Sequence, residues 1–291
     1  MKKVIQYGTY PAVMLGSIWA NVSLMEAGAG ILLATYLPVT IGTLLIIWLE
    51  VRMPYRVSWK PSGKEVAEDS AFLALVHVVW PKLLSIGVAF ALFELWTGRD
   101  WLSYAIWPRE WPIPLQAIAM ALVVDSTRYW LHRISHEWEP LWRFHAVHHS
   151  PHRLYTLNVG RFHPIDKSLQ FLLDALPFIV MGVPPAVLSL YFVFYAVNGF
   201  FQHSNVDVKL GLLNYLMSGP ELHRWHHSMI KEESNHNYGN HLIVWDWLFG
   251  TRYLPSDREV EELGLINRRY PTGFTQQMAA PFYPGLDKAA V

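Results

Sequence analysis

Thirteen of the fourteen histidines fall between residues 132 and 241, and eight of them form three tight clusters. The spacings are H-x3-H, then H-x2-H-H twice, and the members are His132 and His136, then His145, His148 and His149, then His223, His226 and His227. At this histidine content one H-x2-H-H is expected by chance only about 0.03 times, if positions are treated as independent. The clusters therefore indicate a shared chemical role, although a single histidine would more often be structural.

Helical geometry explains how these spacings could serve one site. Residues four apart on a helix share a face, and the three histidines of H-x2-H-H occupy an arc of about 100°. Pro140 and Pro220 precede the second and third clusters at positions typical of a first helical turn, and Pro151 follows the second cluster. We therefore expect each cluster to lie on a helix and to point its rings toward a common centre.

The chemistry expected of such a centre is metal binding. Eight imidazoles exceed the six ligands of one octahedral ion, which predicts two metal ions. Cysteine is absent, which excludes thiolate-ligated zinc, iron–sulfur clusters and disulfides. Imidazole suits iron, copper, zinc and nickel alike. Because the first cluster directly follows an apolar segment, the centre should lie beside lipid. Oxidation of an inert lipid methylene requires a redox metal and dioxygen, so we expect two iron ions, with dioxygen as co-substrate.

Other residues are weaker candidates. His203 and His236 are predicted as further ligands, whereas His163 and His241 more often would be structural, as would His77 and His152. Asp125 lies seven residues before His132 on the same helical face and inside an apolar segment. An intramembrane carboxylate is costly and usually functional. We expect Asp125 either to accept a hydrogen bond from a ligand N–H or to pair with Arg128.

The elements that must position these residues are membrane helices. Hydrophobic residues make up 52% of the chain and charged residues 16%, against about 25% charged in a soluble domain. Segments of about 20 apolar residues, enough to span a bilayer, occur at 27–49, 71–96 and 113–131. Residues 12–49 could form one helix or two. Prolines divide residues 168–201 into pieces of roughly 14 to 16 residues, which favours a hairpin that enters the bilayer only partway.

These segments predict an all-α fold, namely a polytopic membrane helical bundle with a cytosolic, histidine-rich helical cap. We expect membrane-spanning helices in 1–131, a catalytic region with the histidine clusters in 132–254 that includes the 168–201 hairpin, and a C-terminal tail in 255–291. No cleaved signal peptide is expected. The loop at 50–69 has four basic residues and the loop at 99–111 has two. The histidine clusters are therefore predicted on the cytoplasmic face, of the inner membrane in a bacterium or of the endoplasmic reticulum in a eukaryote.

The clusters and their flanking sequences resemble the fatty acid hydroxylase / sterol desaturase superfamily. The three histidine boxes occur in the same order, and the similar flanks are Asp125–Arg133, His148–Ser150, Asn237–Gly239 and Trp245–Thr251, within residues 113–254. The resemblance implies an oxygen- and reductant-dependent diiron enzyme, and it carries the ligand role onto the eight box histidines and His203. Some members have a second histidine where this chain has Gly199. No fused cytochrome b5-like domain is recognised, which predicts a separate electron donor, either ferredoxin or cytochrome b5 with its reductase.

The leading functional hypothesis is hydroxylation of a lipid C–H bond in a fatty acyl chain, aminolipid, sterol or ether lipid. Desaturation on the same centre is an alternative, because the boxes do not determine how the substrate lies. A non-catalytic zinc-binding membrane protein is another, but a transporter would place its ligands within the spans. A zinc hydrolase lacks support because H-E-x-x-H is absent. Nucleic-acid binding is not expected, because Lys plus Arg equals Asp plus Glu at 23 each.

Overall fold

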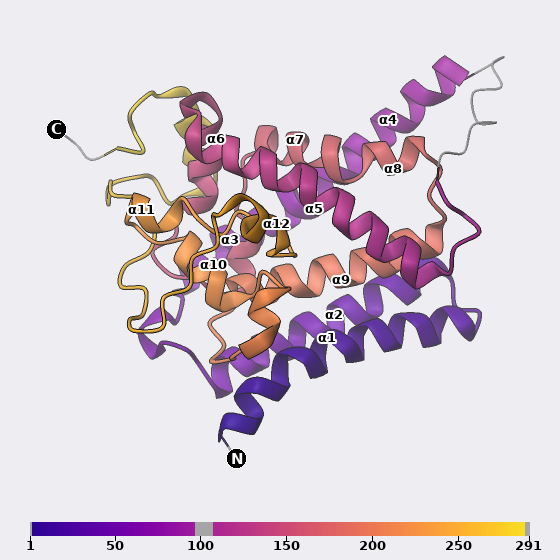
Figure 1. Cartoon of the computed structure of the whole chain (residues 1–291). Coiled ribbons are helices and arrows are strands. Elements are labelled where there is room, and N and C mark those ends of the chain that lie inside the picture. Colours follow the sequence, from indigo (N-terminus) through magenta and orange to yellow (C-terminus); the bar gives the residue numbers. More distant parts are fainter. Residues whose placement is uncertain (1, 97–106, 289–291) are drawn as a thin grey trace.

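The computed structural model of the chain describes residues 2–96 and 107–288. Within these ranges the regular structure is helical, and extended residues meet only as isolated bridges. Figure 1 shows long helices stacked side by side, with short helices and loops gathered at one end of the stack. The expected all-α class is confirmed.

Three helical stretches among the described residues are long and apolar enough to cross a bilayer. They are α2 (Ile31–Arg52), the continuous stretch Gly63–Ala91, and α9 (Pro185–His203). The middle stretch contains α3 (Gly63–Ala71), the π-helical segment η2 (Phe72–Val79) and the first part of α4 (Trp80–Trp96). Outward-facing residues such as Leu44 and Phe90 are exposed. These apolar surfaces are suited to contact with lipid, as expected of a membrane helical bundle.

Residues 12–49, for which one helix or two were possible, belong to two. α1 (Lys2–Glu26) and α2 pack against each other, and the turn between them contains Gly28 with φ +78°, a conformation that favours glycine. Inside the pair, the Asn21 amide donates hydrogen bonds to the Ala34 carbonyl and the Ser189 hydroxyl, each at 2.8 Å. This buried contact joins α1, α2 and α9.

The hairpin region differs from its expected lengths. Its first arm is divided into α7 (Pro164–Asp174) and α8 (Leu176–Val180), but its second arm, α9, is an unbroken helix of 19 residues. Pro184 is the N-cap of α9 and Pro185 is its first residue, so these prolines begin the helix instead of interrupting it. The expectation that this arm is too short to cross a bilayer is wrong.

α9 is the central helix of the bundle. It packs against α1 and α2 on one side and against α5 (Ile113–Glu137) on the other (Figure 1). Its inward residues Val193, Val197 and Phe201 are fully buried in the main hydrophobic core. α5 contains the whole of the predicted 113–131 span, but its buried charged residues make it less apolar than the three stretches above. Of the loop predicted at 99–111, residues 99–106 lie outside the described residues.

The remaining helices form a cap at one end of the bundle (Figure 1). Those around the histidines are α6 (Glu139–His149), η4 (Thr156–Gly160), α10 (Pro220–His226), α11 (Lys231–Ser234) and α12 (Val244–Phe249). The others are η1 (Val57–Trp59), η5 (Gly211–Tyr215), α13 (Phe274–Ala279) and η6 (Ala280–Phe282). The C-terminal helices pack on α3 and α6, so the segment after residue 255 lies against the histidine-rich region.

Gly160 allows η4 to approach η2 closely, which supports a stability prediction. A Cβ atom at this position would lie 2.7 Å from the Cα of Leu73. We expect Gly160→Ala to destabilise the fold by about 1–3 kcal/mol, because backbone must shift to admit the methyl group. Gly199→Ala is the matched control, because its nearest contact would be an ordinary 3.9 Å to Val159. Thermal unfolding in detergent compares the two variants, and equal melting temperatures would contradict the prediction.

Candidate metal centre

Nine histidines converge in two groups where the bundle meets the cap. Within each group, one ring nitrogen per residue lies within 4.8 Å of the corresponding nitrogens of the others. The first group consists of His132, His136, His145, His149 and His226, and the second of His148, His203, His223 and His227. The structure thus brings all eight box histidines and His203 together.

Helix ends present these rings. The first box occupies the last turns of α5, and the second box occupies the last turn of α6. His203 is the last residue of α9, and the third box ends α10, with His227 as its C-cap. α6 and α10 both have a proline in the first turn, as their sequence predicts. Because four separate helices end at one place, imidazoles that are distant in the sequence become neighbours.

The two groups adjoin each other. The rings of His149 and His227 stack with their centroids 4.3 Å apart and their planes inclined by 19°. His148 and His149 are consecutive residues of α6 but belong to different groups, and their ring centroids are 5.5 Å apart. Adjoining groups of five and four imidazoles form a suitable donor set for two neighbouring metal ions.

Most of the rings are held in place by a hydrogen-bond partner at Nδ1. Six of the nine have an oxygen within hydrogen-bond distance of Nδ1: the partners are Tyr238 O for His132, Asn235 Oδ1 for His136, Asp166 Oδ2 for His145, Arg161 O for His148, Asn158 Oδ1 for His203 and His236 O for His226, at 2.8–3.2 Å. A hydrogen bond from Nδ1–H to such an acceptor fixes both the tautomer and the ring orientation. The Nε2 atom of each ring is then left as the free electron-pair donor.

Four of these Nε2 atoms are buried and have no hydrogen-bond partner, namely those of His132, His145, His203 and His226. An unsatisfied buried polar atom costs about 1–3 kcal/mol, so such atoms are uncommon unless they serve a purpose. Imidazole Nε2 is a common metal ligand, and these rings already use Nδ1 for a supporting hydrogen bond. The residues present therefore fit a pair of bound metal ions.

Burial also selects the protonation state that a metal requires. In α6 and α10, burial lowers the pKa of His148, His149, His223 and His227 well below the usual value, and it lowers the pKa of His226 to about 3. Neighbouring imidazoles act in the same direction, because each would repel a second positive charge. These rings are therefore neutral at physiological pH and available for coordination.

Comparison with known proteins connects this geometry to a family. The sequence profile of the family described as fatty acid hydroxylase matches residues 117–251, which include all nine of these histidines. The ornithine lipid hydroxylase OlsE of Rhizobium tropici is 36% identical over 84% of this chain and 74% of its own length. The chain belongs to the fatty acid hydroxylase family. It is therefore an oxidoreductase, and lipid hydroxylation and desaturation are both found among its relatives.

Two further relatives show the range of this similarity. Alkylglycerol monooxygenase of Homo sapiens is 30% identical over 67% of this chain but only 43% of its own length. The Delta(7)-sterol-C5(6)-desaturase of Nicotiana tabacum is 29% identical over 56% of this chain and 55% of its length. No solved structure is significantly similar to the chain.

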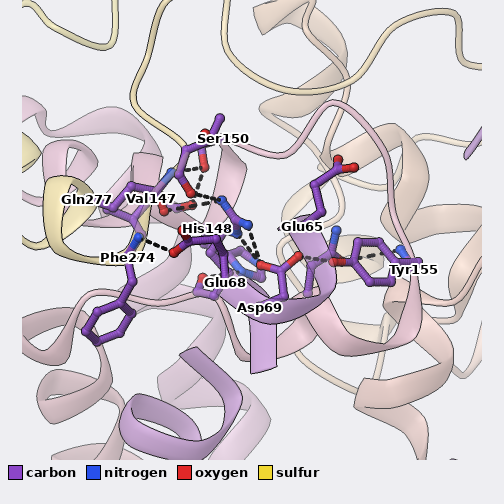
Figure 2. A network of polar contacts seen from close by, with 12 residues as sticks. Glu65, Glu68, Asp69, Val147, His148, Ser150, Tyr155, Phe274 and Gln277 are labelled. Atoms are coloured by element: carbon purple, nitrogen blue, oxygen red, sulfur yellow. Dashed lines mark hydrogen bonds and ion pairs between the residues drawn. The ribbon is translucent and has the colours of Figure 1, made fainter. Parts of the chain in front are cut away.

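In this family member, an ion pair that includes no candidate ligand supports the second histidine box (Figure 2). The carbonyl of Arg161 accepts the hydrogen bond from His148, and its guanidinium pairs with Asp69 through Nε at 2.6 Å. Tyr155 also donates to Asp69, and the three side chains are buried. Figure 2 shows Asp69 and Tyr155 near His148, with Gln277 from the C-terminal segment donating to Ser150 at 2.8 Å. The backbone that holds His148 is thus anchored from α3 and from the C-terminal segment.

The structure does not bring His236 into either group. Its ring packs on Tyr253, with centroids 5.0 Å apart, and only its backbone carbonyl supports the centre by accepting from His226. His163 uses both ring nitrogens outside the centre, toward Met278 O and Ile165 N. His241 contacts Asn198, and His152 contacts Arg268. The ring of His236, predicted as a ligand, thus lies outside both groups and contacts Tyr253 instead.

Asp125 also contacts partners other than those expected. Its Oδ2 accepts hydrogen bonds from the backbone N–H groups of His241 and Leu242 and from no ligand histidine. The charged partner of Arg128 is Asp174, with Nε 3.5 Å from Oδ1. Asp125 therefore fixes the loop that follows Tyr238 onto α5, a backbone role that a helical-face argument could not predict.

Asp166 was missed by the sequence analysis although it supports a box histidine directly. It is 4% exposed, and its Oδ2 lies 2.9 Å from His145 Nδ1. A carboxylate in this position orients the ring and increases its basicity as a ligand. The only available signal was weak: an acidic residue that begins an otherwise apolar segment between two histidine boxes.

We expect Asp166→Asn to lower metal affinity or turnover by about 10–100-fold, because it removes the negative charge behind His145. Metal titration of the purified protein and turnover at saturating metal separate the two effects. Asp257→Asn, on the exposed surface, is the control and should leave both unchanged. An Asp166→Asn variant with wild-type metal affinity and wild-type turnover would contradict the assigned role.

Proposed function

We propose that this chain is a diiron, dioxygen-dependent hydroxylase of a membrane aminolipid. The observation that carries the proposal is the pair of adjoining histidine groups, with unpartnered buried Nε2 atoms, at the end of a membrane bundle. The aminolipid substrate is supported by the 36% identity to an ornithine lipid hydroxylase over most of both chains. The identity to this hydroxylase also favours hydroxylation over desaturation.

The proposed centre requires iron for its redox chemistry: two bound irons supply the capacity to activate dioxygen with external electrons. The protein's own residues orient the ligands, control their protonation and position the centre relative to the lipid. The six Nδ1 acceptors hold the rings in one orientation, so little rearrangement is needed on metal binding. Burial keeps the imidazoles neutral and excludes bulk water from the reacting carbon. α5 and α9 run from the bundle directly to His132 and His203, which places the centre within reach of a lipid held between the helices.

Access from outside the bilayer supports the use of a separate electron donor. A cavity of about 470 Å³ reaches His136 and His149 and is bordered by Trp142. The Trp142 ring lies 5.2 Å and 5.5 Å, between centroids, from the rings of His136 and His149. We propose that the cap faces the cytoplasm, as the basic 50–69 loop favours, and that ferredoxin or cytochrome b5 delivers electrons there.

Metal analysis and isotope labelling test the proposal. The purified full-length protein should contain two irons per chain and, with an electron donor and ¹⁸O₂, should add one labelled oxygen atom to ornithine lipid. Loss of two hydrogens without added oxygen would show desaturation instead. A protein that retains only zinc after removal of its metal and reconstitution with ferrous iron, and that then consumes no oxygen on reduction, would overturn the proposal in favour of a non-catalytic zinc protein.

A further inference from the structure

A second cluster of buried polar residues lies inside the bundle, on the membrane side of the metal centre. It consists of Asp125 and Arg128 on α5, Asp174 on α7, Tyr191 on α9 and His241, and we call it the buried polar cluster. Asp125 and Arg128 precede the ligand candidate His132 by about two turns and one turn of α5. The cluster therefore lies next to the centre but deeper in the bundle.

These residues approach one another from different helices. Arg128 Nε is 3.5 Å from Asp174 Oδ1, and Arg128 Nη2 is 3.5 Å from Asn240 Oδ1. The Tyr191 ring lies beside that of Tyr195, with centroids 5.9 Å apart. The Tyr195 ring lies 4.5 Å from that of His241, whose backbone N–H donates to Asp125. Helices α5, α7 and α9 thus direct polar side chains to one place, although each is otherwise packed through apolar residues.

The hydrogen-bonding capacity of the cluster is not used within the protein. Apart from the ion pair between Arg128 Nε and Asp174 Oδ1, the buried atoms without a hydrogen-bond partner are Asp125 Oδ1, Arg128 Nη1, Tyr191 Oη and His241 Nε2. Asp125 is completely buried, and Arg128 and Tyr191 are each 7% exposed. Unsatisfied polar atoms at this depth are unfavourable, so the cluster is suited to an occupant that supplies the missing partners.

The types of free atom define the chemistry of that occupant. The free Arg128 Nη1 is a donor that fits a carboxylate or phosphate oxygen. The free Asp125 Oδ1 is an acceptor that fits an ammonium group. An occupant that presents an acid oxygen and an ammonium within one small group would satisfy both. An alkyl chain or a sterol ring would leave both atoms without a partner.

Contacts also connect this region to the metal centre. Lys167, on α7, donates to Gln170 at 3.1 Å, and Gln170 donates to Asp166, the carboxylate that supports His145. The Lys167 ammonium lies 5.3 Å from the centroid of Phe162, whose ring stacks on that of His148 at 4.1 Å. Helix α7 thus carries both Asp174 of the cluster and Asp166, the carboxylate behind His145.

We infer that the buried polar cluster is a binding site for the zwitterionic headgroup of a lipid, with Arg128 Nη1 binding its acid oxygen, Asp125 binding its ammonium, and Asp174 holding the Arg128 guanidinium in place. An amino-acid headgroup and a phosphoethanolamine headgroup share this chemistry. The inference deepens the proposed function by assigning a substrate-binding role to residues outside the metal centre. Binding itself requires no turnover, so the two proposals can fail separately.

Equilibrium binding to the purified full-length protein tests the inference, with three lipids that have identical acyl chains: ornithine lipid, phosphatidylethanolamine and diacylglycerol. The wild type should bind at least one zwitterionic lipid about tenfold more tightly than diacylglycerol, and comparison of the two identifies the headgroup. Arg128→Gln should abolish this preference while affinity for diacylglycerol stays within about twofold. Arg133→Gln, on the same helix but paired with Glu137 at the surface, is the control and should retain the preference.

Two milder variants keep the test decisive if Arg128→Gln does not fold. Tyr191→Phe removes only an unpartnered hydroxyl, and Asp174→Asn keeps the side-chain shape; each should weaken zwitterionic binding with no change in metal content. Equal binding of all three lipids by the wild type, or unchanged selectivity in all three cluster variants, would overturn the inference and leave water as the occupant. Selective binding by a protein that takes up no iron on reconstitution with ferrous iron would support the headgroup site and overturn the proposed diiron function.

Discussion

Replacement of His148 by alanine is expected to abolish lipid oxidation and to remove at least one of the two metal ions. His148 belongs to the four-membered group and is adjacent to His149 of the five-membered group, so its loss affects the centre where the groups meet. A four-nitrogen set reduced to three is a poor site for a tightly held ion in this buried position. We expect turnover to fall by about 10³-fold or more, since the proposed redox chemistry would require both ions.

Metal quantification and lipid analysis on the same preparations measure this effect. His152→Ala is the matched control: His152 is only three residues after His149, is exposed, and contacts Arg268 outside both groups. The control should retain full metal content and activity. If His148→Ala retained two irons per chain, the ligand assignment of the second group would have to be abandoned.

Asp69→Ala is expected to cause the largest loss of stability. Its carboxylate is 1% exposed and accepts hydrogen bonds from Arg161 and Tyr155. Without it, the Arg161 guanidinium would remain buried without its charged partner, which typically costs about 3–5 kcal/mol. Since the Arg161 carbonyl holds His148, metal affinity should fall together with thermal stability.

A surface pair provides the comparison. Glu259 pairs with Arg56 but its side chain is 69% exposed, so Glu259→Ala should cost at most about 1 kcal/mol. Thermal unfolding and metal titration on both variants test whether the loss is specific to the buried pair. Similar melting temperatures for Asp69→Ala and Glu259→Ala would show that the ion pair contributes little.

The candidate ligands could be predicted because their information is local. Spacings of three and four residues place side chains on one helical face wherever the helix lies, so the boxes were visible without knowledge of the fold. The atoms that hold the imidazole rings in place could not be predicted in this way. Tyr238, Arg161 and His236 act through backbone carbonyls, whose direction depends on loop geometry and not on residue type. Asp166 comes from the hairpin, whose docking against α6 only the folded chain reveals.

The fold, like the site, could be predicted from the sequence only in part. Apolar length predicted α2 and the stretch that contains α4 as candidate spans, but not α9. Proline was ambiguous: Pro38 lies within α2, whereas Pro184 and Pro185 begin α9. The role of Asp125 depended on residues more than a hundred positions away in the sequence. A buried carboxylate can support a ligand, a backbone turn or a bound headgroup. The sequence around it does not distinguish these roles, because they depend on its neighbours in the folded chain.

The hydrogen bonds that hold six Nδ1 atoms have a consequence for metal supply. Rings that are already oriented need not reorganise for a particular ion, and an all-nitrogen donor set binds zinc more tightly than ferrous iron. The polypeptide therefore has little means of rejecting zinc. For the diiron enzyme proposed above, iron starvation would therefore yield correctly folded but mismetallated, inert protein, and lipid modification would follow intracellular iron availability without any change in gene expression.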